Sequence, residues 1–147
     1  MNAIIENLLT RRSTRAFLQK EIPDNELNEI LQAAIYAPSG MGKQTWKFTV
    51  LCNQEKIQQL AELIGRKLGR KGYDMYRPQV LIIPSNQKEN PHGMEDNACA
   101  LENIFLAAHS FGIGSVWINQ LRTLCDDPEV RALLDAVSYT HLTLPTT

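Results

Sequence analysis

The sequence predicts an α+β fold with a central sheet, and three observations support this prediction. Residues 46–52, WKFTVLC, are rich in β-forming residues and alternate apolar with polar positions, which is typical of a strand. Residues 79–84, QVLIIP, form a continuous apolar run bounded by Pro78 and Pro84, which predicts a buried central strand. Helical periodicity occupies the surrounding segments without strict alternation of strands and helices, which favours the α+β class.

Two helices are expected before the first strand. Residues 2–9 carry four apolar residues on one side, which predicts a short amphipathic helix. Residues 24–37 predict a second helix with Asp24 as its N-cap, because apolar residues recur there at i, i+3, i+4, i+7 and i+8. Pro38 ends this helix, since a proline disfavours helical geometry in the residue before it.

The middle of the chain returns to helical periodicity. Residues 54–68 predict a helix whose apolar positions face one side. The glycine-rich, basic segment at 65–77 then predicts a mobile surface loop or the frayed end of that helix. Residues 95–111 are apolar around most of the helical circumference beyond the first turn, which predicts a buried helix that ends at Gly112.

The last predicted elements are one strand and one helix. Residues 115–118, SVWI, are expected to begin a strand, and Trp46 and Trp117 are expected in the core. Asp127 followed by Pro128 predicts the start of a final helix, because an acidic cap and a proline in the first turn suit a helix N-terminus.

Composition limits the functional classes. The 147 residues suit one soluble domain, and 15 basic against 16 acidic side chains give no global attraction to nucleic acid or to an anionic membrane. No apolar run approaches the roughly 20 residues of a membrane helix, and the N-terminus does not resemble a secretory signal. The three cysteines show no CxxC spacing, so no disulfide framework or zinc site is expected and a cytoplasmic location is favoured.

A basic segment near the N-terminus, TRRSTRAF at 10–17, is the most concentrated candidate site. One interpretation is a solvated basic patch. The other is a pocket for a phosphate or another electron-rich planar group, because arginine forks bind such groups through two parallel hydrogen bonds. The donors are three arginines and three hydroxyl groups: Arg11, Arg12, Arg15, Thr10, Ser13 and Thr14.

Three segments, taken in order, resemble the FMN-dependent nitroreductase family: RRSTRAF, EILQAAIYAPSGMGKQTWKF and GMEDNACALENIFLAAHSFGIGSVWINQL. The resemblance covers residues 1 to about 136. It implies a nitroreductase-like fold, with a mostly antiparallel central sheet flanked by helices, and an intertwined homodimer that binds FMN at its interface. It also implies electron transfer from NADH or NADPH through flavin N5 to nitro, quinone or similar small acceptors by a ping-pong mechanism, with no catalytic side chain.

The resemblance assigns the cofactor contacts. Arg11, Arg12 and Ser13 would hold the FMN phosphate and ribityl chain, and Arg15 would reach the pyrimidine edge of the ring. A cation at that edge would stabilise the negative charge of the reduced flavin. The loop that the partner subunit lays over the ring would supply Pro38, Ser39, Gly40 and Gln44. The strand end that faces the ring near N5 would supply Ile118, Asn119 and Gln120.

Two departures from the family pattern are expected to matter. The family often has asparagine where this chain has Gly42, so a side-chain contact there is missing or replaced by backbone. Residues 137–147, VSYTHLTLPTT, resemble translated vector sequence, which predicts a nitroreductase-like domain at 1–136, incomplete at its C-terminus, and a non-native tail. A divergent natural tail is the alternative.

Two rival functions remain open at this level. The first is a flavin-binding module without turnover, through truncation or divergence. The second is a nucleic-acid or anion-binding protein that combines Arg11–Arg15 with the basic stretch at 66–71. The near-neutral net charge argues against the second, and neither nucleic acid nor a membrane is the expected partner.

Overall fold

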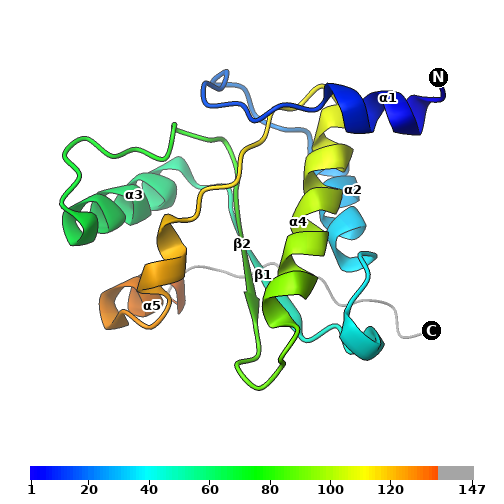
Figure 1. Cartoon of the computed structure of the whole chain (residues 1–147). Helices are drawn as coiled ribbons and strands as arrows, with labels where there is room; N and C mark the ends of the chain where they lie inside the picture. The colour runs from blue at the N-terminus through cyan, green and yellow to red at the C-terminus, as the bar shows by residue number, and fades with distance from the viewer. Residues whose placement is uncertain (136–147) are drawn as a thin grey trace.

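The computed structural model describes residues 1–135, so the predicted tail at 137–147 lies outside the described residues. Helices and strands alternate irregularly along the chain (Figure 1), and the α+β class is confirmed. Their order is α1 (Ala3–Thr10), α2 (Asp24–Ile35), the 3₁₀ turn η1 (Gly40–Gly42), β1 (Trp46–Leu51), α3 (Gln54–Leu68), β2 (Leu81–Asn86), α4 (Gly93–Ser110), the 3₁₀ turn η2 (Gln120–Leu124) and α5 (Pro128–Asp135).

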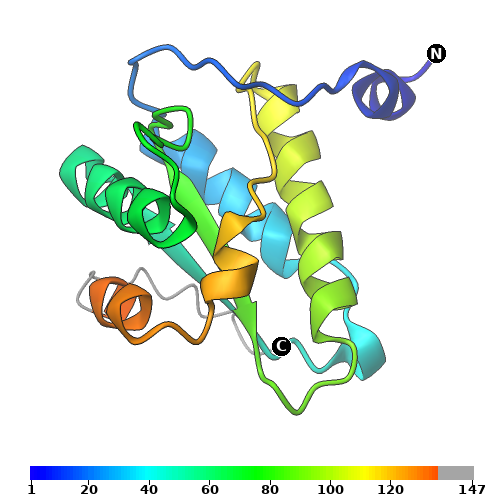
Figure 2. The same ribbon diagram turned by 60° about the vertical axis from the view of Figure 1, so that its left-hand side comes forward.

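Strands β1 and β2 pair antiparallel, with Trp46 opposite Asn86 and Leu51 opposite Leu81. Helices α2 and α4 lie on one side of this ribbon, and α3 and α5 lie on the other (Figures 1 and 2). The core has two parts that follow this division. Phe48 packs in the cluster with α2 and α4, whereas Leu51, which is 1% exposed, packs in the cluster with α3 and α5. The burial of one such leucine stabilises the fold by about 1.5–3 kcal/mol.

The strand predictions need three corrections. The polar position Thr49 is buried, because both faces of β1 are covered by helices and alternation is lost. The predicted strand at 79–84 begins two residues later, and none of its residues is fully buried. Among the described residues β2 pairs only with β1, so it is not central there. The strand expected at 115–118 is wrong: that segment makes one isolated parallel bridge, between Ser13 and Ser115.

Helix termini follow their capping chemistry closely. Asn53 Oδ1 accepts from the Lys56 amide at 3.0 Å and starts α3, and Asp127 Oδ1 accepts from Val130 N at 3.1 Å and starts α5, as predicted. Gly112 adopts φ 73° just after α4, a conformation that favours glycine. The predicted cap of α2 is wrong by one residue, because Pro23 occupies the N-cap position and Asp24 is the first helical residue.

The segment at 65–77, predicted as a mobile surface loop or the frayed end of a helix, forms the last turn of α3 and then a loop that is attached to the core. Gly65 to Leu68 complete α3, and the loop that follows inserts Met75, which is 1% exposed, into the cluster with α3 and α5. The Arg77 carbonyl accepts from Gln19 Nε2 at 3.3 Å, so the loop also contacts the N-terminal segment.

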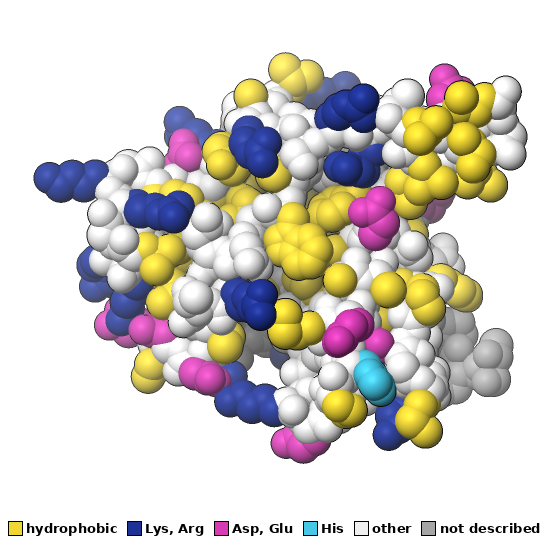
Figure 3. All heavy atoms as spheres, viewed as in Figure 1, with side chains coloured by type: hydrophobic (Ala, Val, Ile, Leu, Met, Phe, Trp, Pro, Cys, Tyr) yellow, Lys and Arg dark blue, Asp and Glu magenta, His cyan; other side chains and the backbone are white. Residues whose placement is uncertain are grey.

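Helix α1 is the outlying element. None of its residues is buried, and its four large apolar side chains, Ile4, Ile5, Leu8 and Leu9, are 42–73% exposed. Figure 3 shows these hydrophobic side chains gathered over α1, with lysines and arginines beside them. Polar contacts attach this helix to α4, since Asn7 Nδ2 donates to the Leu106 carbonyl at 2.9 Å. The apolar face of α1 has no partner of its own within the described chain.

Candidate functional site

The basic segment begins where α1 ends. The Arg12 Nη1 atom donates to the carbonyls of Leu9 at 2.9 Å and Arg11 at 2.8 Å. It therefore satisfies carbonyl groups that a helix C-terminus leaves without an intrahelical donor. The remaining guanidinium donors and the exposed side chain of Arg15 face outward, so both arginines are accessible to an anion.

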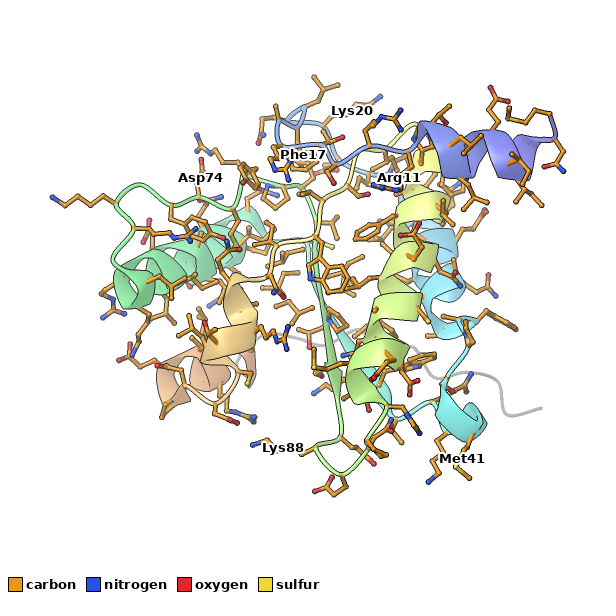
Figure 4. The ribbon with its side chains drawn as sticks, in the orientation of Figure 1. Arg11, Phe17, Lys20, Met41, Asp74 and Lys88 are labelled. Atoms are coloured by element: carbon orange, nitrogen blue, oxygen red, sulfur yellow. The ribbon has the colours of Figure 1, made fainter. Side chains whose placement is uncertain are left out.

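Arg11 is held against α4. Its Nε lies 3.9 Å from the Glu102 carboxylate, and its guanidinium carbon lies 5.9 Å from the centre of the Phe105 ring. The side chain is 29% exposed, so the ring and the carboxylate fix its direction while part of the guanidinium stays open to solvent. Figure 4 shows Arg11 at the end of α4 nearest to α1.

A single bridge joins the basic segment to the segment after α4. The Thr14 amide donates to the Ser115 carbonyl at 2.9 Å, and Ser13 pairs with Ser115. Glycine at position 114 is required by this approach, because a Cβ there would lie 2.8 Å from Thr14 Oγ1. The two segments enclose a shallow pocket of about 190 Å³, lined by Arg11, Ser13, Glu102, Phe105, Ser115, Val116 and Trp117.

Two of the predicted cofactor residues, Arg11 and Ser13, therefore line one pocket. Arg12 lies between them in the sequence, and Arg15 follows two residues after Ser13. Trp117 is 50% exposed at this pocket, which corrects the expectation that it lies in the core. The pocket is built from the N-terminal segment, α4 and the extended chain after α4.

The predicted strand end at 118–120 follows directly after the pocket lining. Ile118 packs against the cluster with α3 and α5, and Asn119 is exposed at the start of η2. The Gln120 Oε1 atom is buried without a hydrogen-bond partner within the described part of the chain. A buried acceptor of this kind is able to accept from an ordered water or from a ligand.

The remaining predicted group of cofactor residues, in the loop at 38–44, lies in a different part of the molecule. Figure 4 places Met41 of this loop at the opposite end of α4 from Arg11. Gln44 is bound locally, because its Nε2 donates to the Ile35 carbonyl and its amide donates to Ser39 Oγ, both at 3.2 Å. Pro38 and Gly40 also belong to this separate region, so one chain does not unite the loop with the arginines.

Sequence reasoning missed three residues that line the pocket or support the site. Glu102 and Phe105 orient Arg11, and their spacing of three on a helix signals only a shared face. Asp96 is buried at 4% exposure, whereas an acidic residue in the first turn of a helix is ordinarily a solvated partner of the helix dipole. Nothing in the sequence distinguishes these roles.

Residues 1–135 contain neither a metal-binding cluster nor a membrane-spanning helix. No group of three or more His, Cys, Asp or Glu side chains there is arranged to hold a metal ion. No helix in the same residues is long and apolar enough to cross a bilayer.

Comparison with known proteins gives a consistent answer. The model of the nitroreductase family matches residues 8–143. An NADPH-flavin oxidoreductase from Vibrio harveyi is 29% identical over 133 residues, which covers 83% of this chain. The chain spans 55% of that relative's length and 59% of the length of a relative from Methanothermobacter thermautotrophicus, so it matches little more than half of these proteins.

Solved structures extend the likeness to three dimensions. A nitroreductase from Bacteroides fragilis with bound FMN shares 46% sequence identity and a TM-score of 0.88, covering 92% of this chain and 80% of that chain. An FMN-dependent nitroreductase from Clostridium difficile shares 34% identity and a TM-score of 0.76, covering 91% and 79%. Since the family model matches most of the sequence and the fold agrees with both structures, this chain belongs to the nitroreductase family.

Proposed function

We propose that this protein is an FMN-dependent oxidoreductase that takes electrons from NADH or NADPH and passes them to a small acceptor such as a nitro compound, a quinone or a flavin. The observation that carries the proposal is the likeness to the Bacteroides fragilis nitroreductase with bound FMN, at 46% identity over 92% of this chain. The related NADPH-flavin oxidoreductase from Vibrio harveyi supports the choice of electron donor.

The residues at the candidate site fit FMN. The cofactor carries a phosphate dianion and a planar ring, and the site offers arginine donors beside two aromatic rings, Phe105 and Trp117. The unpartnered Gln120 Oε1 offers an acceptor for a hydrogen bond from the ring. The arginine donors therefore suit the phosphate of FMN, and the aromatic rings suit its planar ring system.

Each group of residues has a proposed task. Arg11, Arg12 and Ser13 bind the phosphate and ribityl chain, and Arg15 provides a positive charge at the pyrimidine edge. Ile118, Asn119 and Gln120 position the ring edge that exchanges hydride. Bound FMN would supply the hydride-accepting position N5 and would carry the electrons between the nicotinamide donor and the acceptor in a ping-pong mechanism. The protein's part is to orient these reactants and to exclude competing reactions.

The remaining residues act across a homodimer in this proposal. Pro38, Ser39, Gly40 and Gln44 of one subunit cover the ring bound by the arginines of the other. Their distance from Arg11 within one chain supports this arrangement (Figure 4). The exposed apolar face of α1 supports it as well, since a contiguous apolar surface typically marks an interaction site. The three cysteines are free and exposed, which supports a reducing cytoplasmic location.

The test is an absorbance spectrum of the desalted protein with and without added FMN, followed by anaerobic addition of NADH or NADPH. Retained flavin bands that bleach on addition of the donor are expected. Flavin binding without bleaching would indicate a binding module that does not turn over. A protein that takes up no FMN would contradict the proposal.

A pair of variants sharpens this test. The Arg12→Ala substitution is expected to weaken FMN binding by about 1.5–3 kcal/mol, or roughly ten- to 150-fold in Kd, because a charged hydrogen bond is lost. Arg70→Ala is the matched control, since Arg70 is an exposed arginine whose guanidinium lies 5.8 Å from the Tyr73 ring and outside the pocket. Equal losses in the two variants would contradict a phosphate role for Arg12.

A further inference from the structure

Asp96, in the first turn of α4, is a carboxylate only 4% exposed. Its Oδ1 accepts from the Gly40 amide at 2.8 Å, and its Oδ2 accepts from Asn90 Nδ2 at 3.1 Å. Both of these partners are uncharged. The removal of a carboxylate from water is costly unless hydrogen bonds and dipoles replace the lost hydration, and the N-terminus of α4 contributes such a dipole.

The same hydrogen-bond network includes Thr45, which directly follows the loop at 38–44. Residues 39–45 are therefore the segment that this network holds. Asn90 Nδ2 lies 2.9 Å from Thr45 Oγ1, and Thr45 Oγ1 donates to Asn86 Oδ1 at 2.7 Å. Asp96 therefore holds Gly40 directly and contacts Thr45 through Asn90, while Asn86 gives Thr45 a second attachment that does not involve the carboxylate. We call this set of four residues, Gly40, Thr45, Asn90 and Asp96, the loop clamp.

The loop between these attachment points is held in an unfavourable backbone conformation. Met41 and Gln44 have φ values of 56° and 49°, in the left-handed region that non-glycine residues avoid. Met41 is 85% exposed and gains no burial in return. Gly40 also packs closely on the His92 ring, where a Cβ would lie 2.7 Å from Cδ2. Such a conformation persists only where the surroundings determine it strongly.

We propose that Asp96 is a positioning residue, which holds residues 39–45 in the one shape that covers the cofactor bound by the partner subunit. This inference rests on the proposed function, in which this loop covers the FMN ring. A loop fixed before binding does not lose conformational entropy when the cofactor arrives, so its fixation strengthens binding. Asp96 contacts no cofactor in this role and acts through the Gly40 amide.

The test is the Asp96→Asn substitution, which keeps the shape of the side chain but replaces one acceptor oxygen with an NH₂ donor. The matched control is Glu95→Gln, since Glu95 is an exposed acid in the same helical turn. Two quantities are measured for each variant. The first is amide hydrogen exchange of Gly40 and Thr45, relative to amides in α3, in flavin-free protein. The second is the Kd for FMN from a fluorescence titration.

In Asp96→Asn, exchange at Gly40 is expected to rise at least about tenfold while exchange in α3 stays unchanged, because the clamp opens without global unfolding. The Kd for FMN is expected to rise about tenfold, the equivalent of one hydrogen bond. Turnover at saturating FMN is expected to recover, since the chemistry does not involve Asp96. Glu95→Gln is expected to match the wild type in every measurement.

Two results would overturn the inference while the proposed function stands. One is exchange that accelerates equally in α3 and in the loop, which would show a purely structural role. The other is faster exchange at Gly40 with an unchanged Kd for FMN. If the wild-type protein takes up no FMN at all, the proposed function fails and the covering role fails with it. The exchange data would then still report whether Asp96 holds the loop.

Discussion

At Gly40 the absence of a side chain has a direct steric reason. A Cβ at this position would lie 2.7 Å from His92 Cδ2 and 3.0 Å from His92 Cγ, closer than carbon atoms approach without displacement. Gly40 and Gly42 lie two positions apart in the sequence, and glycine is favoured at each for a different reason. Gly42 has φ 65° and open space around it, so its backbone conformation favours glycine. At position 40 the neighbouring His92 ring leaves no space for a side chain.

Gly40→Ala is expected to lower the free energy of unfolding by about 1–3 kcal/mol, because the added methyl group displaces the His92 ring. His92→Ala removes that ring, so the double variant is expected to lose less stability than the sum of the single variants. Urea unfolding of the four proteins measures this coupling. Gly69→Ala is the control: it has φ 65° and open space, so His92→Ala is expected to give it no relief. Strict additivity for Gly40 would contradict the steric explanation.

At the scale of elements, helices were predictable because their signals are local. Apolar spacing identified Gln54–Leu68, and the Asp127–Pro128 pair identified the start of α5. The segment at 115–118 was mispredicted because β-forming residues make a strand only where a neighbour pairs with them, and among residues 1–135 only Ser13 does so. Met75 was missed for a related reason, since its burial depends on how a glycine-rich loop folds back over α3.

The same difference between local signals and long-range contacts explains which residues of the candidate site could be predicted. The arginine segment was predictable as a site because its donor density is visible in sequence, and the pocket contains Arg11 and Ser13. The pocket wall contributed by Glu102 and Phe105, and the clamp at Asp96, arise from packing between distant segments. No local pattern encodes such contacts, so these residues were not predictable.

The junction between α3 and α5 is expected to weaken in acid. The pKa of Asp127 is lowered, first because the Val130 N–H donates to it and further by Lys67. The pKa of Glu129 is also lowered, first by its hydrogen bond from Lys67. Carboxyl groups whose folded pKa lies below the unfolded value stabilise the fold above the unfolded pKa, near 4. They lose this contribution as the pH falls through the folded value.

Asp127→Asn tests this element directly, because asparagine retains the N-cap acceptor but cannot ionise. The variant is expected to have a lower Tm than the wild type at pH 7, with a difference that shrinks as the pH falls below about 4. Thermal unfolding across a pH series measures it. Glu62→Gln, on the exposed surface of α3, is the control. A Tm difference that stays constant with pH would contradict the electrostatic account.

At the scale of the whole molecule, contacts within the described part of one chain do not explain the exposed apolar face of α1. Leu9 is 59% exposed, and Leu9→Glu is expected to leave the stability of a monomer within about 0.5 kcal/mol. The same substitution is expected to dissociate the proposed dimer, because it places a charge in an apolar interface. Sedimentation velocity measures the change, and Leu9→Met is the control that keeps apolar volume. A dimer that survives Leu9→Glu would remove α1 from the interface.

The separation of the arginines from the loop at 38–44 makes a final prediction about assembly. A variant with Arg12→Ala and Arg15→Ala loses one proposed contact to the phosphate and one to the pyrimidine edge, and Asp96→Asn loses the loop clamp, so each homodimer is expected to bind FMN weakly. In a dimer of one variant chain with the other, one site carries both defects and the second carries neither. Equal mixing after dissociation is therefore expected to restore tight binding at about a quarter of all sites, given random two-fold pairing. Fluorescence titration of the mixture counts these sites. If arginines and loop of the same chain formed each site, mixing would restore none of them, and the two-subunit site would be excluded.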